Sequence, residues 1–445
     1  MLETVVIILA ITALAFIVQE RTGLASPITI LGGALTYSFL GGQNLMPIDN
    51  DTFDEILLSL LPLLIMTDAL HLKLQELKEN AASIFYAAVI SVVLAVVSGV
   101  LISKYVLPYD DIPTYYLVML FCMVIATDPV AVCSVFSGAK LPHKLKFTAE
   151  TESLFNDCSA VVIFGIAAMY AKADMAGTTV TTTDLVSHSL MAVGGAAAVG
   201  LVCGIAGLWL LSLSRAVVVE ASILLMAVYA SFYISELFHW AGILAVVVST
   251  LVANTIIKKR ISEDKSIIES ERKALEGEGV SGLVKHFFKI STAIEDEANH
   301  KSITNFIQLF AMLATTVLFL SMAAMVSFDS LMTYWKPIMA VFVATTLIRG
   351  IMMMKFALLS NAASFMQNIN LRWWAILSFA GVKGGLSILL LHMMPGEVKY
   401  MDMFSAIVIG NILLTTFIYP PIMLAIIKLN SAKFEEEAEA EKLIA

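Results

Sequence analysis

The sequence predicts an all-α polytopic membrane protein with about thirteen transmembrane helices. Hydrophobic residues make up 59% of its 445 residues and charged residues only 14%. The apolar residues are gathered in runs long enough to cross a bilayer core of about 30 Å. Two of these runs are broken at matching places in the two halves of the chain, which predicts inverted repeats with two crossed broken helices.

The thirteen predicted spans are apolar runs of about 17 residues or more, separated by polar or Gly/Pro breaks. They lie near residues 2–18, 26–41, 54–72, 80–106, 114–137, 147–171, 184–212, 217–236, 240–257, 302–328, 331–358, 371–394 and 402–428. Residues 1–257 therefore hold membrane helices 1–9, and residues 302–428 hold helices 10–13. We expect residues 258–301 to form a cytoplasmic amphipathic linker and residues 429–445 an acidic cytoplasmic tail, either a solvated helix or disordered.

The orientation follows from the loops that carry basic residues. The intervening loops are mostly acidic or neutral, as in LPYDDIP and KADMAGTTVTTTD. The positive-inside rule therefore places the N-terminus outside and the C-terminus in the cytoplasm, and an odd number of spans agrees with this. The basic residues are Arg21, Lys73, Lys78, Lys140, Lys144, Lys146, Arg215, Lys258, Lys259, Arg260 and Arg372.

Composition also narrows the partners. The net charge of −9 and the lack of a nucleic-acid motif argue against a nucleic-acid partner. The apolar spans indicate that membrane lipids surround the protein. All four cysteines lie inside apolar runs without metal-ligand spacing, and we interpret them as reduced core residues. No cofactor is expected.

The two breaks locate the functional site. The fifth span is interrupted at Thr127, Asp128 and Pro129, and the twelfth at the sequence GVKGG, residues 381–385. Proline removes a backbone donor, and a broken helix is tolerated within a membrane only where its freed groups find partners or line a cavity. Seven spans separate the fifth from the twelfth, which puts the pair in opposite topology. We therefore expect the breaks to cross at a binding site.

Polar residues of the sixth span complete this site. Asp157 lies about ten residues into the span, or roughly 15 Å deep at about 1.5 Å per residue. Ser153 is four residues earlier and shares its face, so a hydroxyl and a carboxylate point together at one small cation that prefers oxygen ligands. Thr127 adds a hydroxyl or a freed carbonyl, and Asp128 adds a second carboxylate. Asn156 is better placed to brace the broken fifth span.

A buried carboxylate can serve two cations in turn. Burial raises the pKa of a carboxylate and a neighbouring cation lowers it, so a proton and a metal ion compete for the same oxygens. If only the loaded form crosses between inward and outward states, obligatory exchange of the two cations follows.

The remaining intramembrane charges have structural interpretations. Glu152 needs a cationic partner, and Arg349 in the eleventh span is the best candidate. Lys383 would neutralise either the carbonyl ends of the half-helices or the charge of Asp128. Asp68, at the end of the third span, would either join the site or be solvated near the interface.

Two motifs together resemble one known family. ATDPVAV (Ala126 to Val132) and ESLFND (Glu152 to Asp157) are similar to the NhaP/NHE-type sodium/proton antiporters of the monovalent cation:proton antiporter superfamily. Residues 235–254 and LIRG at 347–350 extend the resemblance over most of the membrane region. It implies the NhaA/NhaP-like antiporter fold, a homodimer, and an elevator-like movement of a core bundle. It also implies a prokaryotic inner or plasma membrane protein that exchanges Na+ or Li+ for H+ in pH homeostasis.

The resemblance assigns roles to the first group of site residues. Asp157 would bind the ion and the proton, and Ser153 and Thr127 would be further Na+ ligands. Asn156 and Asp128 resemble the pair that holds the unwound helix in place. Asn immediately before Asp resembles the electroneutral branch of the family.

The second group contains both matches and departures. Glu152 and Arg349 resemble the family's stabilising ion pair. The family commonly has an acidic residue where this chain has Thr67, with Asp68 one place later. Lys383 stands where Arg is typical, since the usual GLRG reads GVKGG.

Other functions remain open at this stage. Potassium/proton exchange on the same fold is the main alternative, because oxygen ligands do not reveal the size of the cation. A passive channel would lack coupled exchange. An intramembrane aspartyl protease would use Asp128 and Asp157 as a shared-proton dyad, but the chain lacks a GxGD element there and also lacks GxSxG, so we expect no enzyme.

Overall fold

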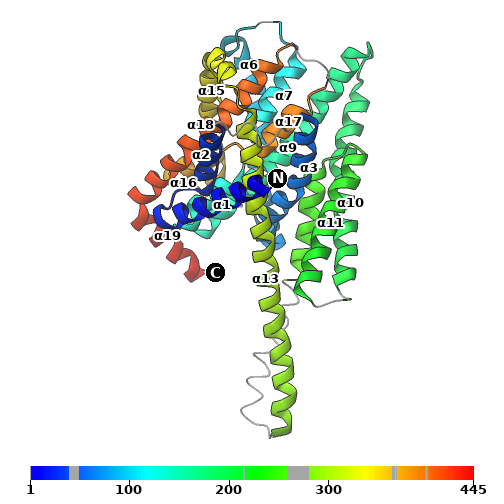
Figure 1. Ribbon diagram of the computed structural model, residues 1–445, viewed down its shortest axis with the longest axis vertical. Helices are drawn as coiled ribbons and strands as arrows, with labels where there is room; N and C mark the ends of the chain where they lie inside the picture. The colour runs from blue at the N-terminus through cyan, green and yellow to red at the C-terminus, as the bar shows by residue number, and fades with distance from the viewer. Residues whose placement is uncertain are drawn as a thin grey trace. The chain divides into compact units, whose positions relative to one another are not determined.

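The computed structural model describes residues 2–39, 50–109, 111–211, 213, 216–257, 280–362, 366, 368–395 and 399–444. Throughout these ranges the regular elements are helices and none is a strand, which confirms the predicted all-α class (Figure 1). Arg215, Lys258, Lys259, Arg260 and positions 258–279 of the predicted linker lie outside the described residues.

The helices follow the predicted spans. Within the described ranges, nine are long and apolar enough to cross a membrane, and Leu58–His71 and Gly242–Ile257 are shorter apolar helices. Each predicted span contains at least one helix. In chain order they are α1 (Leu2–Thr22), α2 (Ser26–Phe39), α3 (Asn50–His71), α4 (Leu74–Glu79), α5 (Ala81–Phe85), the π-helical turn η2 (Tyr86–Ile90), α6 (Ser91–Val106), α7 (Thr114–Ile125), α8 (Pro129–Ser137), α9 (His143–Met175), α10 (Thr182–Leu211), α11 (Val217–Leu237), Gly242–Ile257, α13 (Val280–Met325), α14 (Phe328–Thr333), α15 (Trp335–Ala362), α16 (Leu371–Phe379), α17 (Gly385–His392), α18 (Met401–Leu429) and α19 (Ser431–Ile444).

Part of the predicted linker and most of the predicted acidic tail are helical. α13 begins at Val280 rather than near residue 302, so the second half of the predicted linker continues directly into the tenth span. The acidic tail forms α19, which is separated from α18 by Asn430 alone. Helix formation there agrees with its many Glu and Ala residues, which are good helix formers.

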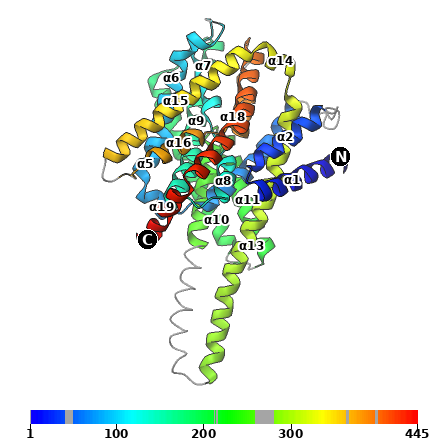
Figure 2. The ribbon, with the colours of Figure 1, turned by 90° about the vertical axis from the view of Figure 1, so that its left-hand side faces the viewer.

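The chain divides into two compact units. The first comprises Met1–Leu61, Leu77–Ala192 and Leu313–Ala445, and the second comprises Pro62–Glu76 and Val193–Met312. Both breaks and the sixth predicted span belong to the first unit. There, α7 packs against α6 and α9, while α15 packs against α6, α16 and α18 (Figure 2).

A single buried cluster holds the two broken helices of the first unit in place. It joins Val135 of α8, Phe356 of α15, Ile376 of α16 and Tyr419 of α18, all at most 2% exposed. Burying an apolar side chain of this size contributes about 1.5–3 kcal/mol, so this packing helps to anchor α8 and α16, one half-helix from each break.

The second unit uses small residues for close helix packing. Gly200 and Gly204 are four residues apart on α10 and face the helix Gly242–Ile257. A Cβ atom on Gly200 would lie 2.4 Å from the carbonyl oxygen of Ala245, and one on Gly204 would lie 3.0 Å from that of Ser249. This is the small-xxx-small spacing by which membrane helices bring their backbones together.

Replacing Gly200 by alanine should therefore destabilise the second unit. The added methyl would meet backbone, which cannot rotate away, and overpacking of this kind costs about 1–3 kcal/mol. We expect a lower melting temperature for Gly200→Ala in detergent, measured by fluorescence-detected size-exclusion chromatography after heating. Gly194→Ala is the matched control, because Gly194 is on the same helix and an added Cβ would meet nothing within 4 Å. Equal melting of both variants would refute the packing argument.

Candidate functional site

The first break lies between α7 and α8. α7 ends at Ile125, and Pro129 is the first residue of α8, where its missing N–H removes no helical hydrogen bond. Asp128 caps α8, since its carboxylate accepts a hydrogen bond from the Val130 amide at 2.9 Å. A side-chain acceptor at this position satisfies a donor that the new helix leaves free.

The second break lies between α16 and α17 and touches the first. The Asp128 amide donates to the carbonyl of Val382 at 2.7 Å, which joins the two interrupted backbones directly. A Cβ atom on Gly384 would lie 2.4 Å from the Cβ of Asp128, so only glycine permits this approach. The two broken helices of the first unit therefore meet at their breaks, as predicted.

Two basic side chains occupy the carbonyl ends left by the breaks. Lys383 donates from Nζ to the carbonyl of Ile125, the last residue of α7, at 3.1 Å. Arg349 donates from Nε to the carbonyl of Leu377, in the last turn of α16, at 3.2 Å. Cations at helix C-termini offset the partial negative charge of the free carbonyls. Each half-helix that ends at a break therefore ends on a positive charge.

Asp157 lies directly against the first break. Its Oδ1 accepts a hydrogen bond from the Thr127 amide at 2.9 Å, and the hydroxyls of Thr127 and Ser153 are hydrogen-bonded to each other at 2.8 Å. Thr127 and Ser153 are 2% and 0% exposed, whereas Asp157 is partly exposed. One carboxylate and two hydroxyls thus converge at the interrupted backbone.

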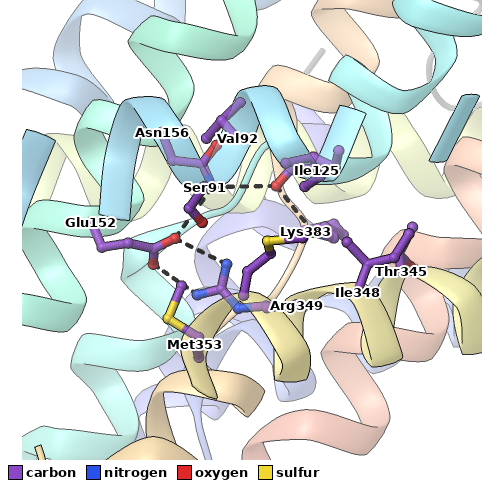
Figure 3. A pocket seen from close by; sticks show the side chains of 12 residues that line it. Ser91, Val92, Ile125, Glu152, Asn156, Thr345, Ile348, Arg349, Met353 and Lys383 are labelled. Carbon is purple, nitrogen blue, oxygen red and sulfur yellow. Dashed lines mark hydrogen bonds and ion pairs between the residues drawn. The ribbon is translucent and has the colours of Figure 1, made fainter. Parts of the chain in front are cut away.

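Asn156 braces the same break from a position about 100° around α9 from Asp157. Its Nδ2 group is within 3.4 Å of the Ile125 carbonyl, 3.4 Å of the Thr127 hydroxyl and 3.5 Å of Glu152 Oε1. Its Oδ1 atom is buried without a hydrogen-bond partner among the described residues. Asn156 and Lys383 both line a cavity of about 30 Å³ (Figure 3). That volume exceeds what one water molecule requires, and water could satisfy the amide oxygen.

Glu152 and Arg349 form a bidentate ion pair at the edge of this cavity. Arg349 Nη1 lies 3.0 Å from Glu152 Oε1, and Nη2 lies 2.7 Å from Oε2. The Glu152 side chain is 2% exposed and that of Arg349 is 11% exposed. Figure 3 shows both side chains pointing toward each other, with Lys383 directed to Ile125. Paired in this way, the two charges are neutralised within the packed interior.

Thr67 and Asp68 belong to the second unit. Both lie on α3, where the Thr67 hydroxyl donates to the carbonyl of Leu64 at 2.6 Å. Asn254 holds the end of this helix by donating to the carbonyls of Leu70 and Leu72 at 2.7 and 3.1 Å. A part for Thr67 or Asp68 in ion binding stays a prediction.

Several contributors to the site were not anticipated from sequence. The Thr415 hydroxyl accepts from the Lys383 amide at 3.1 Å, and the Val382 carbonyl accepts from Asp128. Ser91, at the end of the π-helical turn, lines the cavity. The sequence did offer a sign of the Thr415 contact, because Asn411 and Thr415 form a polar pair four residues apart in an apolar span. Backbone carbonyls leave no such signal.

Breaking the buried ion pair from one side should destabilise the protein. Arg349→Met leaves the Glu152 carboxylate unpaired, which costs roughly 3–5 kcal/mol for a buried charge. We expect a clear drop in melting temperature in detergent. The double variant Glu152→Leu/Arg349→Met removes both charges and should recover part of the loss. A single variant that melts like the wild type would show that the pair carries no stability.

The comparisons with known proteins agree with this architecture. The model of the family "Sodium/hydrogen exchanger, transmembrane" matches residues 5–427. The chain is 26% identical over 364 residues to the Na(+)/H(+) antiporter NhaG of Bacillus atrophaeus, covering 78% of this chain and 59% of the relative. It is 30% identical over 205 residues to the Na(+)/H(+) antiporter NhaH of Halobacillus dabanensis, covering 46% of this chain and 50% of the relative. The matches thus span about half to three fifths of the length of these two relatives.

A solved structure shares the fold. The sodium proton antiporter MjNhaP1 from Methanocaldococcus jannaschii superposes with a TM-score of 0.68 at 16% identity, over 94% of this chain and 98% of that one. This likeness confirms the predicted fold. Because the family model covers nearly the whole chain, the protein belongs to the transmembrane sodium/hydrogen exchanger family, as the two sequence motifs predicted.

Proposed function

We propose that this protein exchanges Na+ or Li+ for H+ across a membrane, with Asp157 carrying each cation in turn. The observation that supports this most directly is the position of the Asp157 carboxylate, which lies against the Thr127 amide at the broken helix, 2.9 Å away. The curated relatives NhaG and NhaH are named as Na(+)/H(+) antiporters, which supports the same activity.

The local groups suit a small monovalent cation. The Asp157 carboxylate provides charge. When Thr127 donates to Ser153 and accepts from Asn156, each of the two hydroxyl oxygens keeps one free lone pair. Hard cations prefer such oxygen ligands. A carboxylate within a membrane protein is stable when a proton or a cation neutralises it, so the two compete for one site.

The other polar groups are assigned to support rather than transport. Glu152 is held by Arg349, Asp128 caps α8, and Lys383 binds the end of α7. Asn156 carries no charge, which leaves Asp157 as the exchangeable acid on this face of α9. One cation for one proton would make the exchange electroneutral.

Alternating access would then follow from movement of the unit that contains both breaks. We propose an elevator-like displacement of this bundle within a homodimer embedded in membrane lipid. The basic loops support an N-terminus outside and a C-terminus in the cytoplasm. We further propose a prokaryotic inner or plasma membrane as the location.

Two alternatives remain of interest. Potassium/proton exchange would use the same oxygen ligands, and only cation selectivity separates it from the proposal. An aspartyl protease would need Asp128 and Asp157 to share one proton. Each carboxylate instead accepts from a different backbone amide, that of Val130 or Thr127, which favours separate roles.

The role of Asp157 can be tested in proteoliposomes. Asp157→Asn removes the group that releases a proton, so Na+-driven proton movement should fall to the level of empty liposomes while the protein stays folded. The matched control is Asp329→Asn, which neutralises an exposed carboxylate at the start of α14. Exchange at the normal rate in Asp157→Asn would exclude this residue as the carrier.

Ion preference and stoichiometry need a separate measurement. We expect proton flux driven by Na+ or Li+, a weak response to K+, and no dependence of the rate on an imposed membrane voltage. A panel of the three cations without ionophore checks the ion preference. Repeating the Na+ and Li+ measurements with and without a potential set by valinomycin and a K+ gradient checks the voltage dependence. A preference for K+ would establish the alternative exchange, and a voltage-dependent rate would contradict electroneutrality.

A further inference from the structure

The acidic helix α19 packs against other helices of the first unit. Phe434 is 0% exposed and belongs to the same buried cluster as Leu145 of α9 and Trp373 of α16. Phe434, Glu437 and Glu441 recur at spacings of three and four residues, which places them on one face of the helix. α19 therefore presents one apolar side chain and two carboxylates to α9 and α16.

Glu437 binds three side chains at the start of α16. Its carboxylate accepts hydrogen bonds from Asn370 Nδ2 and Trp373 Nε1, both at 2.9 Å, and forms an ion pair with Arg372. Asn370 is itself the cap of α16, since its Oδ1 accepts from the Trp373 amide at 3.0 Å. One carboxylate thus fixes the cap and the first turn of the half-helix that leads to the second break.

Glu441 supplies a cap that α9 lacks in its own sequence. The residue before α9 is Pro142, which makes no side-chain cap, and the first turn of the helix contains no acidic residue. Glu441 accepts hydrogen bonds from the amides of His143 and Lys144 at 2.6 and 3.1 Å. A carboxylate at a helix N-terminus satisfies free amides and is favoured by the helix dipole.

The two helices held in this way are the ones that carry the site. α9 bears Ser153 and Asp157, and Asp157 lies about 21 Å along the helix from His143 at about 1.5 Å per residue. α16 leads into the break that contains Val382 and Lys383. A helix is stiff over such lengths, so fixing both starts fixes the relative placement of the two ends where the site is formed.

We propose that α19 is a strap whose residues Glu437 and Glu441 position α9 and α16 and thereby set the affinity of the cation site. This inference rests on the proposed exchange activity, since affinity is measured by it. Neither glutamate touches the transported ion. Glu441 acts through α9, which it caps, and Glu437 acts through α16, whose cap it holds, so both are positioning residues.

The test compares the apparent KM for Na+ in proteoliposomes for wild type, Glu437→Gln, Glu441→Gln and the double variant. We expect the double variant to raise KM about fivefold, the equivalent of losing one ordinary helix cap, with a smaller change in Vmax. Each single variant should raise KM by less. Glu439→Gln is the control, because Glu439 is an exposed carboxylate of the same helix that forms no hydrogen bond or ion pair with α9 or α16 among the described residues. Its KM should match the wild type.

The outcomes separate the strap from the activity on which it rests. A KM that is unchanged in all three strap variants, while the wild type exchanges normally, would overturn the inference even if their melting temperatures fall. A double variant that does not fold would leave the two single variants to decide by the same criterion. A wild type without Na+-driven exchange would count against the proposed function. The strap would then be judged by whether Na+ raises the melting temperature of the variants only at higher concentration than for the wild type.

Discussion

The central constraint on this protein is that a helix interrupted within an apolar interior leaves backbone groups that must find partners. An unpaired buried amide or carbonyl costs several kcal/mol in a medium without water. The two breaks meet part of this requirement together, through the hydrogen bond from the Asp128 amide to Val382. The Ile125 carbonyl is taken by Lys383, and the Thr127 amide is taken by the carboxylate of Asp157. Each break therefore depends on the other for a hydrogen-bond partner, and this requires the two breaks to lie side by side.

This arrangement joins ion binding to backbone structure. Asp157 is at once a partner of the broken backbone and the acid proposed to bind cations. When a proton or a cation occupies its oxygens, the hydrogen bond to the Thr127 amide weakens or reorients, because the negative charge that strengthened it is neutralised. Under the proposed function, a change in the occupancy of Asp157 would act directly on the break between α7 and α8.

The two carboxylates of α9 show how environment assigns different roles to similar groups. Glu152 of α9 forms a buried bidentate ion pair with Arg349 of α15. Arg349 also binds the end of α16, so the pair connects three helices. Asp157 is partly exposed, and among the described residues it forms no ion pair. A paired, buried charge serves structure, whereas an accessible carboxylate with only a neutral donor is free to exchange its counter-ion.

By itself, the sequence determined the fold class, the order of the spans, the positions of both breaks and the identity of the polar residues on α9. These properties follow from local patterns, because apolar length, proline, glycine and helical spacing are read within one segment. For the acidic tail it left a solvated helix and disorder as alternatives, and the structure has the helix α19 there. Charge and composition do not reveal that Phe434 is buried or that Glu441 caps α9.

Only the tertiary structure decided which groups meet. Arg349 and Glu152 are 197 positions apart, Lys383 and Ile125 are 258 apart, and His143 and Glu441 are 298 apart. Contacts with Val382, Ile125 and Leu377 are made by backbone carbonyls, which are identical in every residue and carry no mark in the sequence. Which charged residue forms an ion pair and which caps a helix depends on distances of a few ångströms in the folded chain, because hydrogen bonds and ion pairs act over that range.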